Sequence, residues 1–270
     1  MAAASPPAVS VRAAPSTPAR PSAPPSRPRT DQIRDMGTIR RDSVDTDLWT
    51  AHGTVKVTGD VNVGTAELEG TVSIAGKLTA GTFRSRGALE VGGPVDVSGT
   101  CTSSGGLRAA LTFHAIEADL RGPNQLIGAV SIDRLLAVRG SLDAPSLTVG
   151  AFTLEGEARV PGEIVGRSVS AHFTSASALG AVRAATVTLR AKVPNLVEKL
   201  FGRQMAVTVR RVEADAVDLE GVDVEFVRAP KITLGREAHI TEYEGTIVRR
   251  HPTSRVGFES RSPRPYGLSR

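Results

Sequence analysis

The chain has 270 residues and a formal net charge of +5. Hydrophobic residues make up 40% of the chain, and aromatic residues make up only 4% of it. This composition favours a narrow core of small aliphatic side chains over a conventional globular core. The single cysteine excludes an intramolecular disulfide and favours a cytoplasmic location, and no segment approaches the ~20 apolar residues that span a bilayer.

Residues 1–47 are rich in Pro, Ala and Arg, and we expect them to be disordered because they carry too little apolar surface to offset the entropy of ordering. Arginine is frequent here and in residues 251–270, the predicted C-terminal tail, so the tails concentrate the positive charge. Such tails suit an anionic membrane surface, phosphates or the clients of a scaffold, with plain solubilisation as the alternative. They lack the interleaved aromatic residues of a specific nucleic-acid site.

Glycine recurs at nearly constant intervals between residues 53 and 105, and each glycine opens a unit of the form Gly-x-apolar-x-apolar. These glycines are Gly53, Gly59, Gly64, Gly70, Gly76, Gly81, Gly87, Gly93, Gly99 and Gly105. Alternating apolar residues are typical of strands with one buried face, and we expect a glycine of positive φ at each corner between them. The units are too short for separate hairpins. We therefore predict an all-β fold, a parallel β-helix (solenoid) whose turns of about 17 to 18 residues stack about 4.8 Å apart.

The pattern continues less regularly to the end of a first run of turns, residues 48–192, in which Leu48 and Trp49 would cover the open end. Residues 193–205 place Leu196, Val197, Leu200 and Phe201 at helical spacing, which predicts a short helix or hinge. Alternation resumes over residues 206–250, the predicted second run.

The chain resembles the bactofilin family of polymer-forming cytoskeletal proteins, in its longer type with two runs of repeats. The resemblance rests on the repeats at 53–105 and on two later stretches, VRRVEADAVDLEGVDVEFVRAPKITLG (209–235) and HITEYEGTIVRR (239–250). It implies a right-handed β-helix that polymerises end to end without a nucleotide into scaffold filaments near the membrane. Some members carry a short apolar N-terminal anchor, and this sequence shows none.

Alternative functional classes fit fewer of these features. Left-handed hexapeptide solenoids, which include acyltransferases, place an aliphatic residue before glycine, as at Val63-Gly64. The histidines follow no spacing that would stack them around zinc. The acidic residues between 213 and 225 alternate with apolar ones, which indicates a solvated outer face rather than the carboxylate cluster of a polysaccharide-cleaving β-helix. We predict no enzymatic activity, no cofactor, no metal and no small-molecule substrate.

A parallel stack leaves unpaired backbone groups and an apolar cross-section at both ends, so we predict self-association through the ends. Two patches are expected to form the contacts, near the start and near the finish of the stack: Val55, Val57, Val61 and Val63, and Phe226, Ile232, Leu234, Ile240, Tyr243 and Ile247. The resemblance suggests head-to-head and tail-to-tail contacts between subunits, and the sequence leaves head-to-tail contact open as the alternative. The rival interpretation is a solenoid that serves as a binding module. Cys101 occupies an apolar slot and is expected to be buried rather than reactive.

Overall fold

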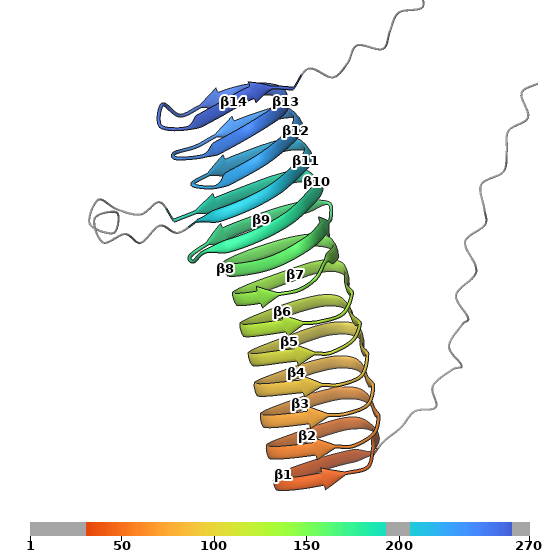
Figure 1. The fold of residues 1–270 in the computed structure, drawn as a ribbon. Coiled ribbons are helices and arrows are strands. Elements are labelled where there is room, and N and C mark those ends of the chain that lie inside the picture. Colours follow the sequence, from red (N-terminus) through yellow and green to blue (C-terminus); the bar gives the residue numbers. More distant parts are fainter. Residues whose placement is uncertain (1–30, 193–205, 261–270) are drawn as a thin grey trace, which may run out of the picture.

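A computed structural model of the protein describes residues 31–192 and 206–260, which form one continuous parallel β-solenoid (Figure 1). All 14 strands belong to a single sheet in the order of the sequence. The predicted β-helical fold is therefore confirmed. The strands are β1 (Gln32–Arg41), β2 (Val44–Val57), β3 (Val61–Ile74), β4 (Leu78–Val91), β5 (Val95–Ala109), β6 (Phe113–Leu126), β7 (Val130–Asp143), β8 (Leu147–Val165), β9 (Ser168–Phe173), β10 (Ser177–Ala191), β11 (Val207–Glu220), β12 (Asp223–Leu234), β13 (His239–Arg250) and β14 (Arg255–Glu259).

Most turns consist of one long strand that bends around the core rather than three separate short strands. Strand β3, for example, runs without a break through three of the glycine units. Residues that lie opposite each other on neighbouring turns are 17 or 18 positions apart in the regular part of the stack, as in the hydrogen bonds Asn62–Asp45 and Arg108–Glu90. The length of the turn therefore agrees with the prediction.

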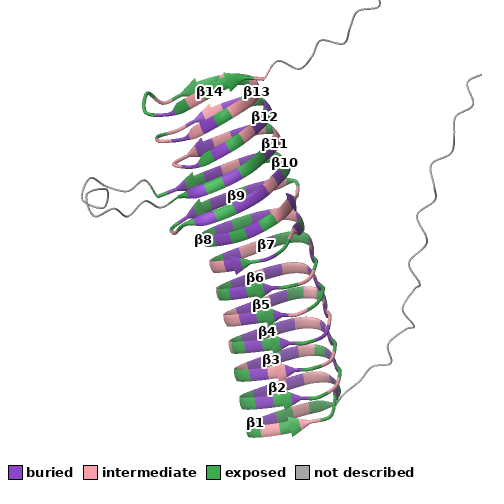
Figure 2. Ribbon diagram, viewed as in Figure 1, coloured by how far each residue is buried: buried purple, intermediate pink, exposed green. Residues whose placement is uncertain are grey.

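The core consists of columns of side chains that point inward from successive turns, and Figure 2 shows buried and exposed residues alternating along the strands. One column contains Trp49, Ala66, Phe83, Cys101 and Ala118, each opposite the next. All five residues are buried. Small residues lie between the large rings, which lets stacked turns interdigitate at the density of a protein interior.

The ten repeat glycines are required for two different reasons, which corrects the expectation that all of them adopt positive φ. Only Gly53, Gly70, Gly87 and Gly105 have positive φ, and they lie opposite one another in one column. The other six are needed because of close approach between turns. A Cβ added at Gly81, for example, would lie 2.5 Å from the carbonyl oxygen of Gly64. Such a contact is far shorter than van der Waals distance, so a side chain would push the turns apart.

The boundaries of the solenoid differ from those predicted. It begins with β1, inside the segment assigned to the N-terminal tail, and it ends with β14, inside the predicted C-terminal tail. The two predicted runs are one stack, because β10 pairs in register with β11, placing Ser177 opposite Val207. The predicted helix at 193–205 lies outside the described residues. No helix within residues 31–192 and 206–260 is long and apolar enough to cross a membrane.

Candidate assembly surfaces at the two ends of the solenoid

Strand β1 forms the N-terminal edge of the described solenoid. It pairs with β2 along one side, and no described strand pairs with its other side. Its inward positions are Ile33, Asp35, Ile39 and Arg41, which lie opposite Trp49, Ala51, Val55 and Val57 of β2. Two charged side chains therefore occupy positions that hold apolar residues one turn further in.

Asp35 and Arg41 form an ion pair across the end of the core. Arg41 donates from Nη2 to Asp35 Oδ1 at 2.6 Å and from Nε to Oδ2 at 2.8 Å, while Trp49 Nε1 donates to Oδ2 at 3.0 Å. Asp35 is only 2% exposed. The hydrogen bonds from Arg41 lower the pKa of Asp35, against the opposing effect of burial, and the bond from Trp49 lowers it further. The pair gives the end of the core a polar cover whose buried groups are satisfied.

The backbone edge of this first turn is nevertheless open. Gly37 has positive φ and leads the column of glycines that continues through Gly53 and Gly70. A Cβ added at Gly53 or Gly70 would collide with the carbonyl group of the preceding turn, whereas a Cβ at Gly37 would meet no described atom within 4 Å. The space that a preceding turn occupies elsewhere in the stack is therefore vacant among the described residues.

The predicted N-terminal patch is wrong. Val55, Val57, Val61 and Val63 are core residues of β2 and β3, each at most 4% exposed, and β1 covers the turn to which Val55 and Val57 belong. The sequence did hold a signal for β1, since Met36-Gly37-Thr38-Ile39 repeats the form of His52-Gly53-Thr54-Val55. Charged residues at two of its inward positions, Asp35 and Arg41, interrupt the alternation of apolar and polar residues that would otherwise predict a strand.

Strands β13 and β14 form the C-terminal edge. Strand β14 is short and covers only the first part of β13, pairing with residues from His239 to Tyr243. The stretch from Glu244 to Arg250 has no described strand beyond it. Val248 and Phe258 are each 61% exposed at this end, and Figure 2 shows β14 largely exposed.

Only part of the predicted C-terminal patch lies at this edge. Tyr243 and Ile247 are half-buried residues of β13 that pack against the end of the core. Ile232, Leu234 and Ile240 are buried and belong to the interior. Phe226 points outward on the side of the rod, where the guanidinium carbons of Arg211 and Arg228 lie 4.8 Å and 5.9 Å from its ring centroid. Sequence analysis missed Val256 and Phe258 because both lie in the predicted tail.

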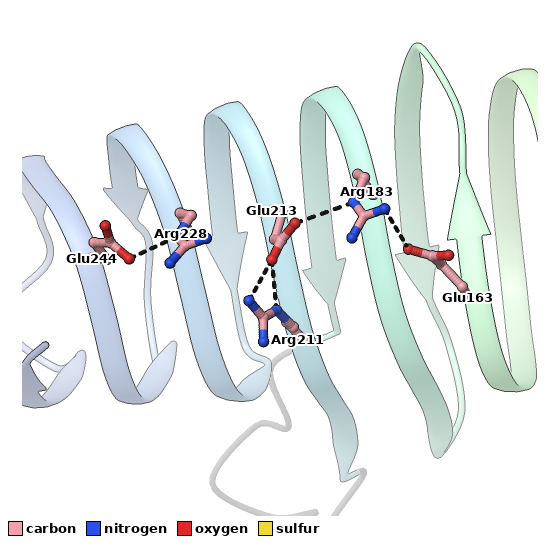
Figure 3. A network of polar contacts seen from close by, with 6 residues as sticks. All are labelled: Glu163, Arg183, Arg211, Glu213, Arg228 and Glu244. Atoms are coloured by element: carbon pink, nitrogen blue, oxygen red, sulfur yellow. Dashed lines mark hydrogen bonds and ion pairs between the residues drawn. The ribbon is translucent and has the colours of Figure 1, made fainter. Parts of the chain in front are cut away.

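Two acidic residues of the second run, Glu213 and Glu244, take part in a column of alternating charge on the outer surface (Figure 3). Arg183, Glu213, Arg228 and Glu244 occupy successive turns in register. Glu213 accepts from Arg183 at 3.1 Å and from Arg211, and Arg228 donates to Glu244 at 2.7 Å. The hydrogen bond from Arg211 lowers the pKa of Glu213 against the effect of burial. The acidic residues between 213 and 225 are exposed or half-exposed, as predicted, and arginines form ion pairs with Glu213 and Asp218.

The remaining candidate residues show no reactive arrangement. Cys101 is buried, and burial raises the pKa of its thiol to about 12, so the thiolate is scarce at neutral pH. His114 lies between two carboxylates, with its Nδ1 3.1 Å from Asp96 Oδ1 and its Nε2 3.4 Å from Asp133 Oδ1. The described residues contain no group of three or more metal-ligating side chains placed to hold an ion.

Comparison with known proteins adds no family assignment. No family model matches the chain, and neither a curated protein nor a solved structure is significantly similar to it. Functional inference therefore rests on the geometry of the solenoid.

Proposed function

We propose that this protein is a non-enzymatic cytoplasmic scaffold that associates end to end into filaments without a nucleotide, in the manner of the bactofilins that its repeats resemble. One observation carries the proposal. Both ends of the described solenoid present strand edges that no described strand pairs with, β1 at one end and Glu244–Arg250 with β14 at the other. Unpaired parallel edges are templates for further strand pairing.

The apolar residues at the C-terminal edge support the same proposal. Ile247 and Val256 are only partly buried, and both pack on the core. A second subunit on this edge would remove their remaining surface from water, which stabilises association by roughly 25 cal/mol per Å² of apolar area. The backbone groups of the edge would gain partners at the same time.

Electron microscopy and sedimentation of the purified full chain, without added nucleotide, test the proposal. We expect filaments from the unmodified protein and their loss in Ile247→Asp, which places a charge at the C-terminal edge. Ile127→Asp is the matched control, because Ile127 is 47% exposed in the connection between β6 and β7, far from both ends. Circular dichroism verifies that both variants keep their β structure. Monomers of the unmodified chain at all accessible concentrations would refute end-to-end assembly.

A further inference from the structure

A groove follows one side of the solenoid from β3 to β7. It has a volume of about 420 Å³, and the core leucines Leu89 and Leu107 lie at its base. Because neighbouring turns are about 4.8 Å apart, the four steps from β3 to β7 give it a length of about 19 Å. Its floor is a column of small or short residues on successive turns: Thr71, Ala88, Gly106, Pro123 and Ser141.

The glycine at the middle of this floor is not required by the fold. A Cβ added at Gly106 would meet nothing closer than Pro123, at 3.6 Å, which is an ordinary van der Waals contact. Its neighbour Gly105 differs, because it has positive φ and an added Cβ would collide with the carbonyl oxygen of Gly87. The lack of a side chain at Gly106 therefore keeps the groove open without serving the packing of the turns.

The groove also holds a polar group that the solenoid leaves unsatisfied. Asn124 lines the groove and is 3% exposed. Its amide nitrogen donates to the carbonyl oxygens of Gly122 and Ser141 at 2.8 Å and 3.2 Å, whereas its Oδ1 has no hydrogen-bond partner among the described residues. A buried acceptor without a donor is unfavourable, so an occupant that brings an N–H group to this point gains a hydrogen bond.

The sequence before β1 carries prolines at a spacing that matches this groove. Prolines recur there at every third position: Pro15, Pro18, Pro21 and Pro24. A polyproline II helix has three residues per turn and rises about 3.1 Å per residue, so such prolines lie on one edge with a repeat of about 9.3 Å. Two turns of the solenoid measure about 9.6 Å. Successive prolines of this edge therefore coincide with every second turn of the groove.

We propose that residues 15–21 bind in this groove of the same subunit as a polyproline II segment. The distance from Pro15 to Pro21 in that conformation is about 19 Å, the length of the groove. Pro21 then lies over β3, Pro15 lies over β7, and the central Pro18 lies over β5 in the space that Gly106 leaves open. This inference does not depend on the proposed end-to-end association.

The chain between the segment and β1 is long enough for this placement. Thr71 is in the same column as Thr38 of β1, two turns or about 10 Å along the axis. Thr38 lies seven residues after Asp31, a path of about 23 Å along the strand. The ten residues from Pro21 to Asp31 reach up to about 33 Å when extended, more than the roughly 25 Å that separates the two points.

Polar groups of the segment complement those of the groove. Residues 1–30 contain no acidic residue, and Arg20 lies within the segment. The exposed side chains of Glu90 and Asp143 line the groove, and Arg108 beside them already donates to Glu90 at 3.3 Å. A polyproline II backbone makes no internal hydrogen bonds, so the N–H groups between the prolines are free to donate to the Asn124 amide oxygen.

The contact can be weak and still be occupied, because the segment is tethered to the solenoid. A short flexible connection gives an effective concentration on the order of 1 mM. If the groove binds the free segment with a Kd of about 0.1 mM, roughly nine of ten molecules hold their own segment at this effective concentration. A polyproline II segment also loses little conformational entropy on binding, since its conformation is largely preformed.

Disulfide trapping in the full chain tests the placement. Ala19→Cys, next to the central proline, is combined either with Gln125→Cys at the groove or with Asn62→Cys as the control. Gln125 and Asn62 are both exposed, but Asn62 lies outside the groove and nearer to β1, where an undocked tail arrives at least as easily. The native Cys101 is buried. We expect the disulfide within one chain to form at least about tenfold faster with Gln125→Cys than with Asn62→Cys, as measured by mobility under denaturing conditions.

Two further variants show whether the groove and the prolines cause this difference. Gly106→Phe fills the groove, and replacing both Pro18 and Pro21 by Ser removes the edge that enters it. Each change should reduce the rate with Gln125→Cys to that of the control pair, whereas replacing Pro6 and Pro7 by Ser should leave it unchanged. The proline variants change only the tail, so they keep the test valid if Gly106→Phe disturbs the fold.

The outcomes that would overturn the inference are distinct from those that bear on filaments. Equal rates for the Gln125→Cys and Asn62→Cys pairs would show that the segment does not bind in the groove. Disulfides that form only between copies, at a rate that rises with protein concentration, would overturn the placement in the same subunit. Filament formation is not a readout of these experiments, so end-to-end assembly is judged separately by microscopy.

Discussion

Replacement of Asp35 by Asn tests whether the polar cover of the N-terminal edge holds β1 in place. The substitution keeps the size of the side chain but removes the charge that accepts two hydrogen bonds from Arg41. Asp35 is almost completely buried, whereas the Arg41 side chain is 34% exposed and can be partly rehydrated. We therefore expect a loss of about 1–3 kcal/mol in the free energy that keeps β1 docked, less than the full cost of breaking a deeply buried pair.

Trp49 makes this loss measurable without a label. It is the only tryptophan of the chain, it is fully buried, and its Nε1 donates to Asp35. Its fluorescence therefore reports on the first turn, while circular dichroism reports on the whole stack. In urea titrations of Asp35→Asn, the fluorescence transition should move to lower urea and separate from the circular dichroism transition, because each turn contacts only its neighbours. Asp42→Asn, at an exposed site, is the matched control.

The same pair predicts how the first turn responds to pH. The pKa of Asp35 is lowered by Arg41, so its contribution is complete above the unfolded-state pKa of about 3.9 and is lost as the pH falls through the folded value. The unmodified protein at low pH should therefore approach the behaviour of Asp35→Asn at neutral pH. Coincident transitions in Asp35→Asn, or an equal shift in the Asp42→Asn control, would refute the reasoning.

Three further outcomes follow from the geometry of the stack. Gly70→Ala should lower the free energy of unfolding by at least about 2 kcal/mol, because Gly70 has positive φ and an added Cβ would collide with Gly53. Gly106→Ala is the control and should cost less than about 1 kcal/mol, because its Cβ would make ordinary contacts. Chemical denaturation compares the two variants, and equal losses would contradict the requirement for glycine at position 70. Glu213→Gln should lower the free energy of unfolding by about 0.5–1 kcal/mol at low salt and by less at high salt, because the arginine partners of Glu213 are about half exposed. Glu225→Gln, at an exposed site, is the control. A loss in the same assay that does not depend on salt would argue against the ion pairs. The contribution of Glu213 should also decline as the pH falls through its lowered pKa. Cys101 should react with a thiol reagent only after unfolding, and rapid modification of the native protein would show that its turn opens readily.

The repeat pattern was enough to predict a parallel solenoid, its turn length and the burial of Cys101. Alternation of apolar residues fixes which side chains point inward, and the spacing of the glycines fixes where turns come close. Both signals are local, so they are readable before any tertiary contact is known. They could not show that six of the repeat glycines are needed for close approach alone, because that depends on the backbone of the preceding turn.

The tertiary structure alone decided where the stack ends, and with it which residues belong to the edges. Val55 and Val57 have the same local pattern as an exposed terminal turn would have, and they are interior only because β1 pairs beyond them. Strand β1 escaped detection since Asp35 and Arg41 stand at inward positions. Charged residues are tolerated there because they pair with each other at the end of the core, next to solvent. A long-range pairing, and not the local sequence, therefore determined which surface is available to a second copy.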